Sequence, residues 1–393
     1  MTKEQSSAKI WTKDFITISV AYFFVFIVFY ALLTTLPLYV IYELGESEAR
    51  AGLVVTSMLV AAILVRPFAP KLVEIFGKKK ILLLMLLLYT ITMGLYLLID
   101  DFMPLLAIRF LHGISFAVVT TVMSAIAVDV IPKERKGAGM GYFAMAMNLA
   151  VVIGPFIGLL IAQQLSFRAL FIVLTAIMIV SLVTSFFLNV HEQERKQTAF
   201  SLSFHDLIEV KALPVGILSG LIGFAYASIL SFVPIYAEEI GLAHVASYFF
   251  LVYAGLMLLT RPALGRAFDE KGPRAVLIPC LGLFAFGLML LGFTTTGIVL
   301  LVSAALIGIG YGTLLPGFQT MAIQSTSHER SGHAIATFFI FFDIGISLGA
   351  YTWGVIVDRS GFETMYFIGS ALVVATIFVY LLLDTRLRKK AKA

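Results

Sequence analysis

The chain has little charge and almost no cysteine. Of its 393 residues, 13% are Asp, Glu, Lys or Arg, and Cys280 is the only cysteine. Soluble globular chains carry about 25% charged residues, so the composition excludes an ordinary soluble domain. A single cysteine excludes an internal disulfide and a thiolate metal cluster.

The motifs of several catalytic and ATP-driven classes are also missing. The sequence has no glycine-rich loop ending in Gly-Lys-Ser or Gly-Lys-Thr, which argues against ATP as the energy source. His328 and His333 are five residues apart and miss the shared helical face of a zinc-protease motif. The glycines of segment 308–312 lack the spacing and the strand of a dinucleotide loop. We therefore expect no enzyme, no metal site and no cofactor.

Long apolar runs take the place of the missing charge, since 60% of the residues are hydrophobic. A run of about 20 apolar residues crosses a bilayer as a helix. These runs lack the alternation of a membrane β-barrel, so they predict an all-α membrane protein. Twelve spans are expected, at 15–40, 49–70, 81–99, 102–131, 138–163, 168–190, 212–238, 244–264, 275–293, 297–326, 332–357 and 362–383.

The charges that remain are placed unevenly. If the N-terminus lies inside, 24 of the 28 Lys and Arg residues fall in inner segments, and only Arg50, Arg168 and Arg359 fall in outer loops. Basic residues mark the cytoplasmic side of membrane proteins. The pattern therefore predicts a multi-pass protein of the cell membrane with both termini in the cytoplasm. It leaves little of the net charge of +5 to suggest a nucleic-acid partner.

The chain repeats itself at an interval of 195 residues. Arg66-Pro67 returns as Arg261-Pro262, and Glu74 and Gly77 return as Asp269 and Gly272. Such repeats indicate a tandem duplication, which gives a body with two-fold pseudo-symmetry. We expect a six-helix bundle over 1–190, a cytoplasmic linker over 191–211, and a second bundle with a basic tail over 212–393. We expect the protein to act as a monomer in the lipid bilayer.

Few ionisable residues lie deep inside the expected spans, and Arg109, His112 and Asp343 are the candidates among them. A charge near the bilayer centre costs at least about 2.5–3.5 kcal/mol, so such residues usually face a cavity and serve function. Asp343 lies near the middle of its span, whereas its repeat mate Asn148 cannot titrate. This asymmetry favours Asp343 as a proton-coupling site, with His112 as a second titratable group and Arg109 tuning either. A permanent ion pair between Arg109 and Asp343, or Asp343 bonding to backbone, is the structural alternative.

The motifs resemble those of the major facilitator superfamily, and more narrowly its proton-driven efflux branch, over essentially the whole chain. The segment 70–79 is similar to the family's loop between helices two and three, with Glu74 in place of its aspartate. Segment 109–113 matches the helix-four motif of the efflux branch except that His112 replaces a glutamine. Segment 154–158 matches most of the helix-five motif.

This resemblance implies a gate on the cytoplasmic side. Glu74 is expected to hold that side shut, with Asp129 and Arg135 as partners, and Asp269 and Arg330 form the equivalent set in the second half. The alternative is that these charges only set topology. An aromatic and amide wall is expected to bind the substrate, although such side chains also pack or face lipid; its candidate residues are Phe26, Tyr30, Asn148, Tyr226, Tyr311 and Gln319.

The sequence thus predicts a secondary transporter that exports a small molecule by alternating access, driven by a proton gradient. One alternative is a proton symporter that imports a sugar or an organic acid. Another is a membrane receptor that senses its ligand without moving it. A membrane enzyme is the third alternative, and no paired catalytic groups support it. The sequence does not name the substrate.

Overall fold

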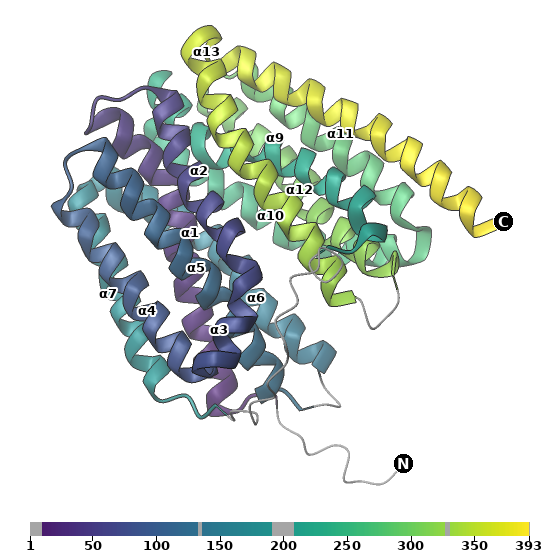
Figure 1. Cartoon of the computed structure of the whole chain (residues 1–393). Coiled ribbons are helices and arrows are strands. Elements are labelled where there is room, and N and C mark those ends of the chain that lie inside the picture. Colours follow the sequence, from purple (N-terminus) through teal and green to yellow (C-terminus); the bar gives the residue numbers. More distant parts are fainter. Residues whose placement is uncertain (1–9, 133–135, 191–207, 327–330, 393) are drawn as a thin grey trace. The chain divides into compact units, whose positions relative to one another are not determined.

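We describe a computed structural model that covers residues 10–132, 136–190, 208–326 and 331–392 (Figure 1). Within these ranges the regular secondary structure is helical, as the composition predicts. The helices are α1 (Lys13–Tyr42), α2 (Glu48–Val65), η2 (Arg66–Phe68), α3 (Ala69–Phe76), α4 (Lys78–Leu95), η3 (Tyr96–Leu98), α5 (Phe102–Val130), α6 (Lys136–Gln164), α7 (Phe167–Phe186), η5 (Val210–Ala212), α9 (Leu213–Glu239), α10 (Ala243–Lys271), α11 (Pro273–Gly292), α12 (Gly297–Gln324) and α13 (Ser331–Lys392).

By length and composition, eleven helical segments of the described residues could cross a membrane. The last of them, His333–Leu383, has 51 residues. At about 1.5 Å per residue it is far longer than the roughly 30 Å hydrocarbon core of a bilayer. Gly361 interrupts it with a non-helical backbone (φ 79°, ψ 170°), and Figure 1 shows α13 turning back on itself. The segment therefore supplies two spans, which confirms the predicted twelve.

The second span ends earlier than the sequence predicted. We expected it to run over 49–70, but α2 ends at Val65 and is followed by the short helices η2 and α3. Pro67 and Pro70 account for the break, because proline lacks a backbone N–H and its ring clashes with the carbonyl one turn earlier. The segment that was expected as a loop between the second and third spans thus forms a separate short helix, α3, after α2.

The repeated loops have the same backbone at their ends. Gly77 begins α4 with φ 82° and ψ 154°, and Gly272 begins α11 with φ 83° and ψ 165°. A positive φ favours glycine, since a Cβ would be strained there. These two glycines are equivalent positions of the repeat, so the geometry explains why both copies keep the residue.

The chain divides into two compact units. One comprises Met1–Leu33 and Val60–Phe200, and the other comprises Thr34–Leu59 and Ser201–Ala393. The border passes through the middle of α1 and of α2, so the ends of these helices that meet at residues 43–47 pack with the second unit. The division into two bundles of six helices, read from the repeat, stays a prediction.

Glycines bring helices of one predicted half into close contact. A Cβ on Gly154 of α6 would lie 2.9 Å from the carbonyl oxygen of Ile27 in α1. A Cβ on Gly345 of α13 would lie 2.0 Å from the Gly220 oxygen of α9, and one on Gly349 would lie 2.6 Å from the Phe224 oxygen. In lipid, such small residues allow the backbone contact that hydrophobic burial cannot drive.

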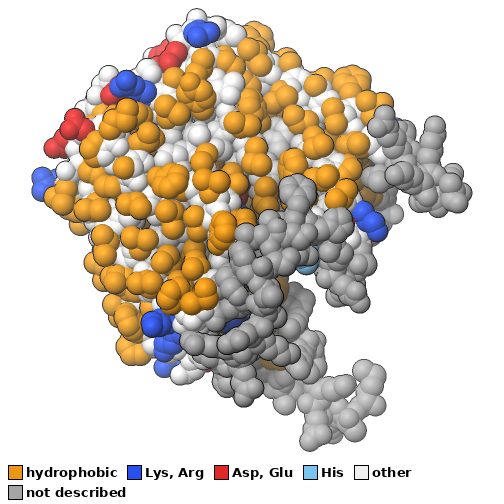
Figure 2. Space-filling view, in the orientation of Figure 1, with side chains coloured by type: hydrophobic (Ala, Val, Ile, Leu, Met, Phe, Trp, Pro, Cys, Tyr) orange, Lys and Arg blue, Asp and Glu red, His pale blue; other side chains and the backbone are white. Residues whose placement is uncertain are grey.

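The outer faces of the helices are apolar as well. On α4, Leu84, Leu87 and Ile91 are exposed, whereas Leu86 and Tyr89 are buried. On the face in Figure 2, hydrophobic side chains cover most of the described surface. Exposed apolar surface of this extent fits lipid rather than water. The chain is therefore a multi-pass membrane protein.

Candidate functional site

A buried polar cluster surrounds the two predicted residues of α5. Arg109 and His112 lie one turn apart, and neither is exposed. The hydroxyl group of Tyr96, in η3, shares a hydrogen bond of 3.0 Å with Nδ1 of His112. The sequence analysis did not single out Tyr96. Its signal was present, since a tyrosine near the end of an aliphatic span needs a partner for its hydroxyl.

Three further contacts belong to this cluster. The ring of Tyr89, in α4, meets the His112 ring edge-on at a centroid distance of 4.1 Å, and its hydroxyl donates to the Val25 carbonyl at 3.3 Å. The Arg109 guanidinium interacts with the Tyr96 hydroxyl. Nε2 of His112 is buried and has no hydrogen-bond partner among the described residues. The cluster therefore holds an imidazole nitrogen without a described partner in an apolar interior.

Two residues of the predicted substrate wall, Phe26 and Tyr30, belong to a larger packed group of aromatic rings. Phe26 and Tyr30 lie in α1 with a centroid distance of 6.1 Å. Phe29 stacks on Phe116 of α5 at 4.5 Å, and Phe26 meets the same Phe116 ring at 5.5 Å. Phe26 is buried and Tyr30 is half-buried. Of these residues, Tyr30 keeps the more accessible surface for a ligand.

Two other residues of the predicted wall, Tyr226 and Tyr311, stack directly on each other. The rings of Tyr226 in α9 and Tyr311 in α12 have a centroid distance of 4.0 Å and an interplanar angle of 14°. Tyr253 of α10, which sequence reasoning missed, donates from its hydroxyl to that of Tyr226 at 3.2 Å. The three rings come from three different helices, so the pattern of one helix could not have joined them.

The glycines around Tyr311 explain how its helix reaches its neighbours. A Cβ on Gly308 would lie 2.1 Å from the Tyr253 carbonyl oxygen, and one on Gly310 would lie 2.6 Å from the Cys280 oxygen. A Cβ on Gly312 would lie 2.4 Å from the Met257 side chain. The segment that superficially resembles a dinucleotide loop is thus the contact of α12 with α10 and α11.

Asp343 lies in the first arm of α13, before the break at Gly361, and is half-buried. Gln319 lies in α12 and is also half-buried. Arg109 falls in the first compact unit and Asp343 in the second, so the ion pair between them is not tested and stays a prediction. The proton-coupling roles of Asp343, Arg109 and His112 likewise stay predictions.

Most of the predicted gate falls outside the described part of the chain. Arg135 and Arg330 are not among the described residues, and neither are the side chains of Glu74 and Asp269. The side chain of Asn148 is also outside it. Asp129 is exposed near the end of α5, where its carboxylate forms an ion pair with Lys78 at the start of α4. The Lys78 side chain therefore ties α4 to α5.

No group of three or more His, Cys, Asp or Glu residues in the described ranges could hold a metal ion. The polar groups of the candidate sites described above are buried hydrogen-bonding side chains and the half-buried carboxylate of Asp343. Such groups can hold protons or bind a ligand, but they do not form a catalytic pair.

Comparison with known proteins places the chain in a family. The Major Facilitator Superfamily model matches residues 18–270 and 215–393. The multidrug resistance protein MdtG of Yersinia enterocolitica is 27% identical over 358 residues, which cover 86% of this chain and 85% of that protein. An uncharacterized MFS-type transporter of Methanocaldococcus jannaschii is 25% identical over 362 residues, covering 88% and 93%.

Solved structures show the same fold. The nucleoside transporter NupG aligns with a TM-score of 0.76 at 15% identity, covering 94% of this chain and 98% of that one. A POT family transporter in complex with 5-aminolevulinic acid aligns with a TM-score of 0.81 at 15% identity, covering 95% and 96%. Helices, repeated loops and relatives agree: the chain belongs to the Major Facilitator Superfamily, and it is a membrane transporter.

Proposed function

We propose that this transporter exports small molecules across the cell membrane in exchange for protons, by alternating access. The observation that carries the proposal is its similarity, over 86% of the chain, to a protein named multidrug resistance protein. No nucleotide motif is present in the sequence, which favours an ion gradient as the source of energy. Both termini are proposed to lie in the cytoplasm, from the placement of the basic residues.

Asp343 is the proposed proton site. It lies well inside the first arm of α13, between Phe342 and Ile344 in the chain. A carboxylate there is costly in lipid, so its retention favours a functional role. In the proposed cycle, Asp343 takes a proton from outside and releases it inside, while the substrate moves the other way. The stacked tyrosines Tyr226 and Tyr311 are proposed to bind the substrate through their rings.

The test is transport in vesicles that contain the purified protein and a proton gradient, with a panel of fluorescent drug-like compounds. The Asp343→Asn variant should lose gradient-driven accumulation and fall to the level of empty vesicles, because an amide does not titrate. It should keep exchange of labelled for unlabelled substrate without a gradient. Asp100→Asn, a change in an exposed loop acid, is the matched control and should transport like the parent.

Three outcomes would contradict the proposal. If Asp343→Asn accumulates substrate as well as the parent, the proton site lies elsewhere. If the parent moves substrate in the same direction as the protons, the protein is a symporter. Saturable binding without exchange would indicate a receptor.

A further inference from the structure

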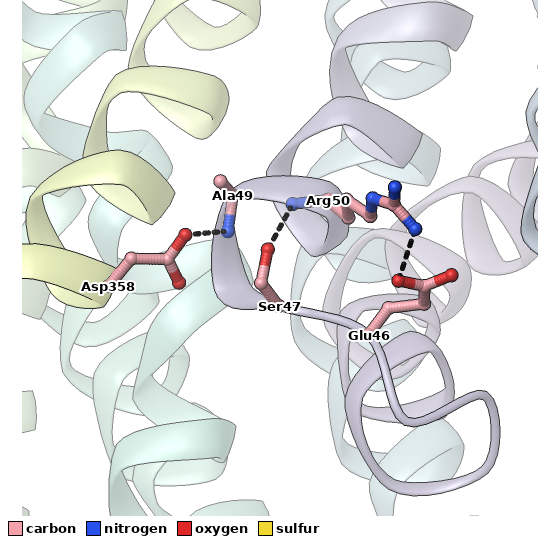
Figure 3. A network of polar contacts seen from close by, with 5 residues as sticks. All are labelled: Glu46, Ser47, Ala49, Arg50 and Asp358. Carbon is pink, nitrogen blue, oxygen red and sulfur yellow. Dashed lines mark hydrogen bonds and ion pairs between the residues drawn. The ribbon is translucent and has the colours of Figure 1, made fainter.

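The first turn of α2 is completed by a side chain from another helix. Ser47 precedes α2, and its hydroxyl oxygen accepts from the Arg50 N–H at 3.4 Å. The N–H groups of Glu48 and Ala49 have no such partner within their own helix. They donate instead to the two carboxylate oxygens of Asp358 in α13, at 3.0 and 3.3 Å. Figure 3 draws the contact of Ala49 with Asp358. One carboxylate thus satisfies two of the donors that a helix N-terminus leaves open.

The place of Asp358 within α13 makes this contact informative. Asp358 lies three residues before Gly361, in the last turn of the first arm. A carboxylate there is disfavoured by the negative end of its own helix and favoured by the positive N-terminal end of α2. The position of Asp358 in its own helix therefore does not account for an acidic residue there, whereas its contact with the start of α2 does.

The contact continues along both helices as a seam of small residues. A Cβ on Gly354 would lie 2.4 Å from the Glu48 carbonyl oxygen, and one on Gly52 would lie 2.1 Å from the Ala350 oxygen. Further along, the Thr56 hydroxyl donates to the Ser347 carbonyl at 2.7 Å. In these contacting pairs the residue numbers increase along α2 and decrease along α13, so the two helices run antiparallel. All of these residues belong to one compact unit.

The seam joins two repeats that alternating access must separate. By sequence, α2 belongs to the first six helices and α13 to the last ones. We propose that this seam is the gate on the side opposite the amino terminus, and that Asp358 is its latch; the proposal rests on the proposed alternating-access function. Asp358 is exposed, so when the gate opens, water replaces the N–H groups at its carboxylate. The glycines let the backbones separate without unlocking large interdigitated side chains.

The test measures how often the seam opens. The parent is a chain with Cys280→Ser and Thr56→Cys, reconstituted in nanodiscs, because the sequence has no other cysteine. The reporter sulfur replaces the hydroxyl that contacts Ser347, so a maleimide reagent reaches it when the seam parts. Adding Asp358→Ala should raise the labelling rate about threefold to thirtyfold, the range expected for loss of a helix cap.

Two control variants separate the latch from general damage. Glu46→Gln removes a carboxylate of the same loop that pairs with Arg50, and should label like the parent. Ser47→Ala removes the cap that α2 makes for itself and weakens the helix start without touching Asp358, so it should label close to the parent as well. If Asp358→Ala does not fold, Asp358→Asn serves in its place, with a smaller rise expected because an amide oxygen still accepts.

An unchanged labelling rate in a folded Asp358 variant would overturn the latch. An equal rise in Ser47→Ala would also overturn it, because fraying of α2 alone would then explain the effect. These outcomes do not depend on proton coupling. A parent that fails to accumulate substrate in the vesicle assay would defeat the proposed function, whatever the labelling shows.

Discussion

A buried imidazole needs partners for both ring nitrogens, and the described part of the structure gives His112 one, the Tyr96 hydroxyl. Burying a polar atom without a partner costs about 1–3 kcal/mol. The hydrogen bond from Nδ1 to the Tyr96 hydroxyl therefore fixes the orientation of the His112 ring. It leaves Nε2 pointing away from Tyr96. The same hydroxyl interacts with Arg109, so it joins the two polar residues of α5.

The Tyr96→Phe variant tests this bond. It keeps the ring but leaves Nδ1 of His112 without its described partner, so we expect a loss of about 1–3 kcal/mol of stability. Thermal unfolding in detergent measures the loss as a lower midpoint temperature. Tyr142→Phe, whose side chain is 43% exposed, is the matched control and should leave the midpoint unchanged. An equal midpoint for Tyr96→Phe would show that the bond contributes nothing to stability.

At the scale of helices, glycine positions decide which elements touch. Gly345 of α13 faces the Gly220 carbonyl of α9, whereas Gly94 of α4 has no atom within 4 Å of an added Cβ. This difference in space decides the effect of a larger side chain. At Gly345 the added carbon would push against the backbone of α9, and a helical backbone cannot shift at one residue alone. The two glycines look alike in sequence and have opposite structural roles.

Alanine substitutions at these two glycines should therefore have opposite effects. Gly345→Ala would place a methyl group 2.0 Å from a backbone oxygen, so we expect a cost of about 1–3 kcal/mol, typical of overpacking. Gly94→Ala should be neutral or stabilise by up to about 1 kcal/mol, since alanine favours helix. Thermal unfolding of both variants under one set of conditions checks this. A stable Gly345→Ala protein would mean that α9 and α13 can move apart at little cost.

At the scale of the whole molecule, the repeat and the compact units divide the chain differently. The repeat assigns α1 and α2 to the first half, but residues Thr34–Leu59 group with Ser201–Ala393. The surface of α2 around Gly52 and Thr56 is therefore covered by residues of α13, which comes from the other half of the chain. A transporter that alternates between two states needs such contacts to be present in one state and absent in the other.

Two fragments, 1–200 and 201–393, expressed together should therefore co-purify in detergent. Gly52→Leu in the first fragment should reduce the recovered pairs, because its side chain begins 2.1 Å from the Ala350 oxygen. Gly94→Leu, where an added Cβ has nothing within 4 Å, is the matched control. Recovery that does not change with Gly52→Leu would show that the seam does not hold the fragments together.

The sequence by itself determined the helices, their number and the duplication, because these depend on apolar runs and on residues at fixed intervals along one chain. It also placed Arg109 and His112 one turn apart, since a helix fixes the spacing of its own residues. The tertiary structure alone decided their partners. Tyr96 beside His112, Tyr253 beside Tyr226 and Asp358 at the start of α2 all come from other helices.

The physical reason lies in the solvent. A helix of a soluble protein has one apolar face, and that face shows where it packs. In lipid, the packed face and the exposed face are both apolar, so the pattern of one helix does not indicate its neighbour. Only the assembled helices show which glycines touch a backbone and which carboxylate receives its hydrogen bonds from a second helix.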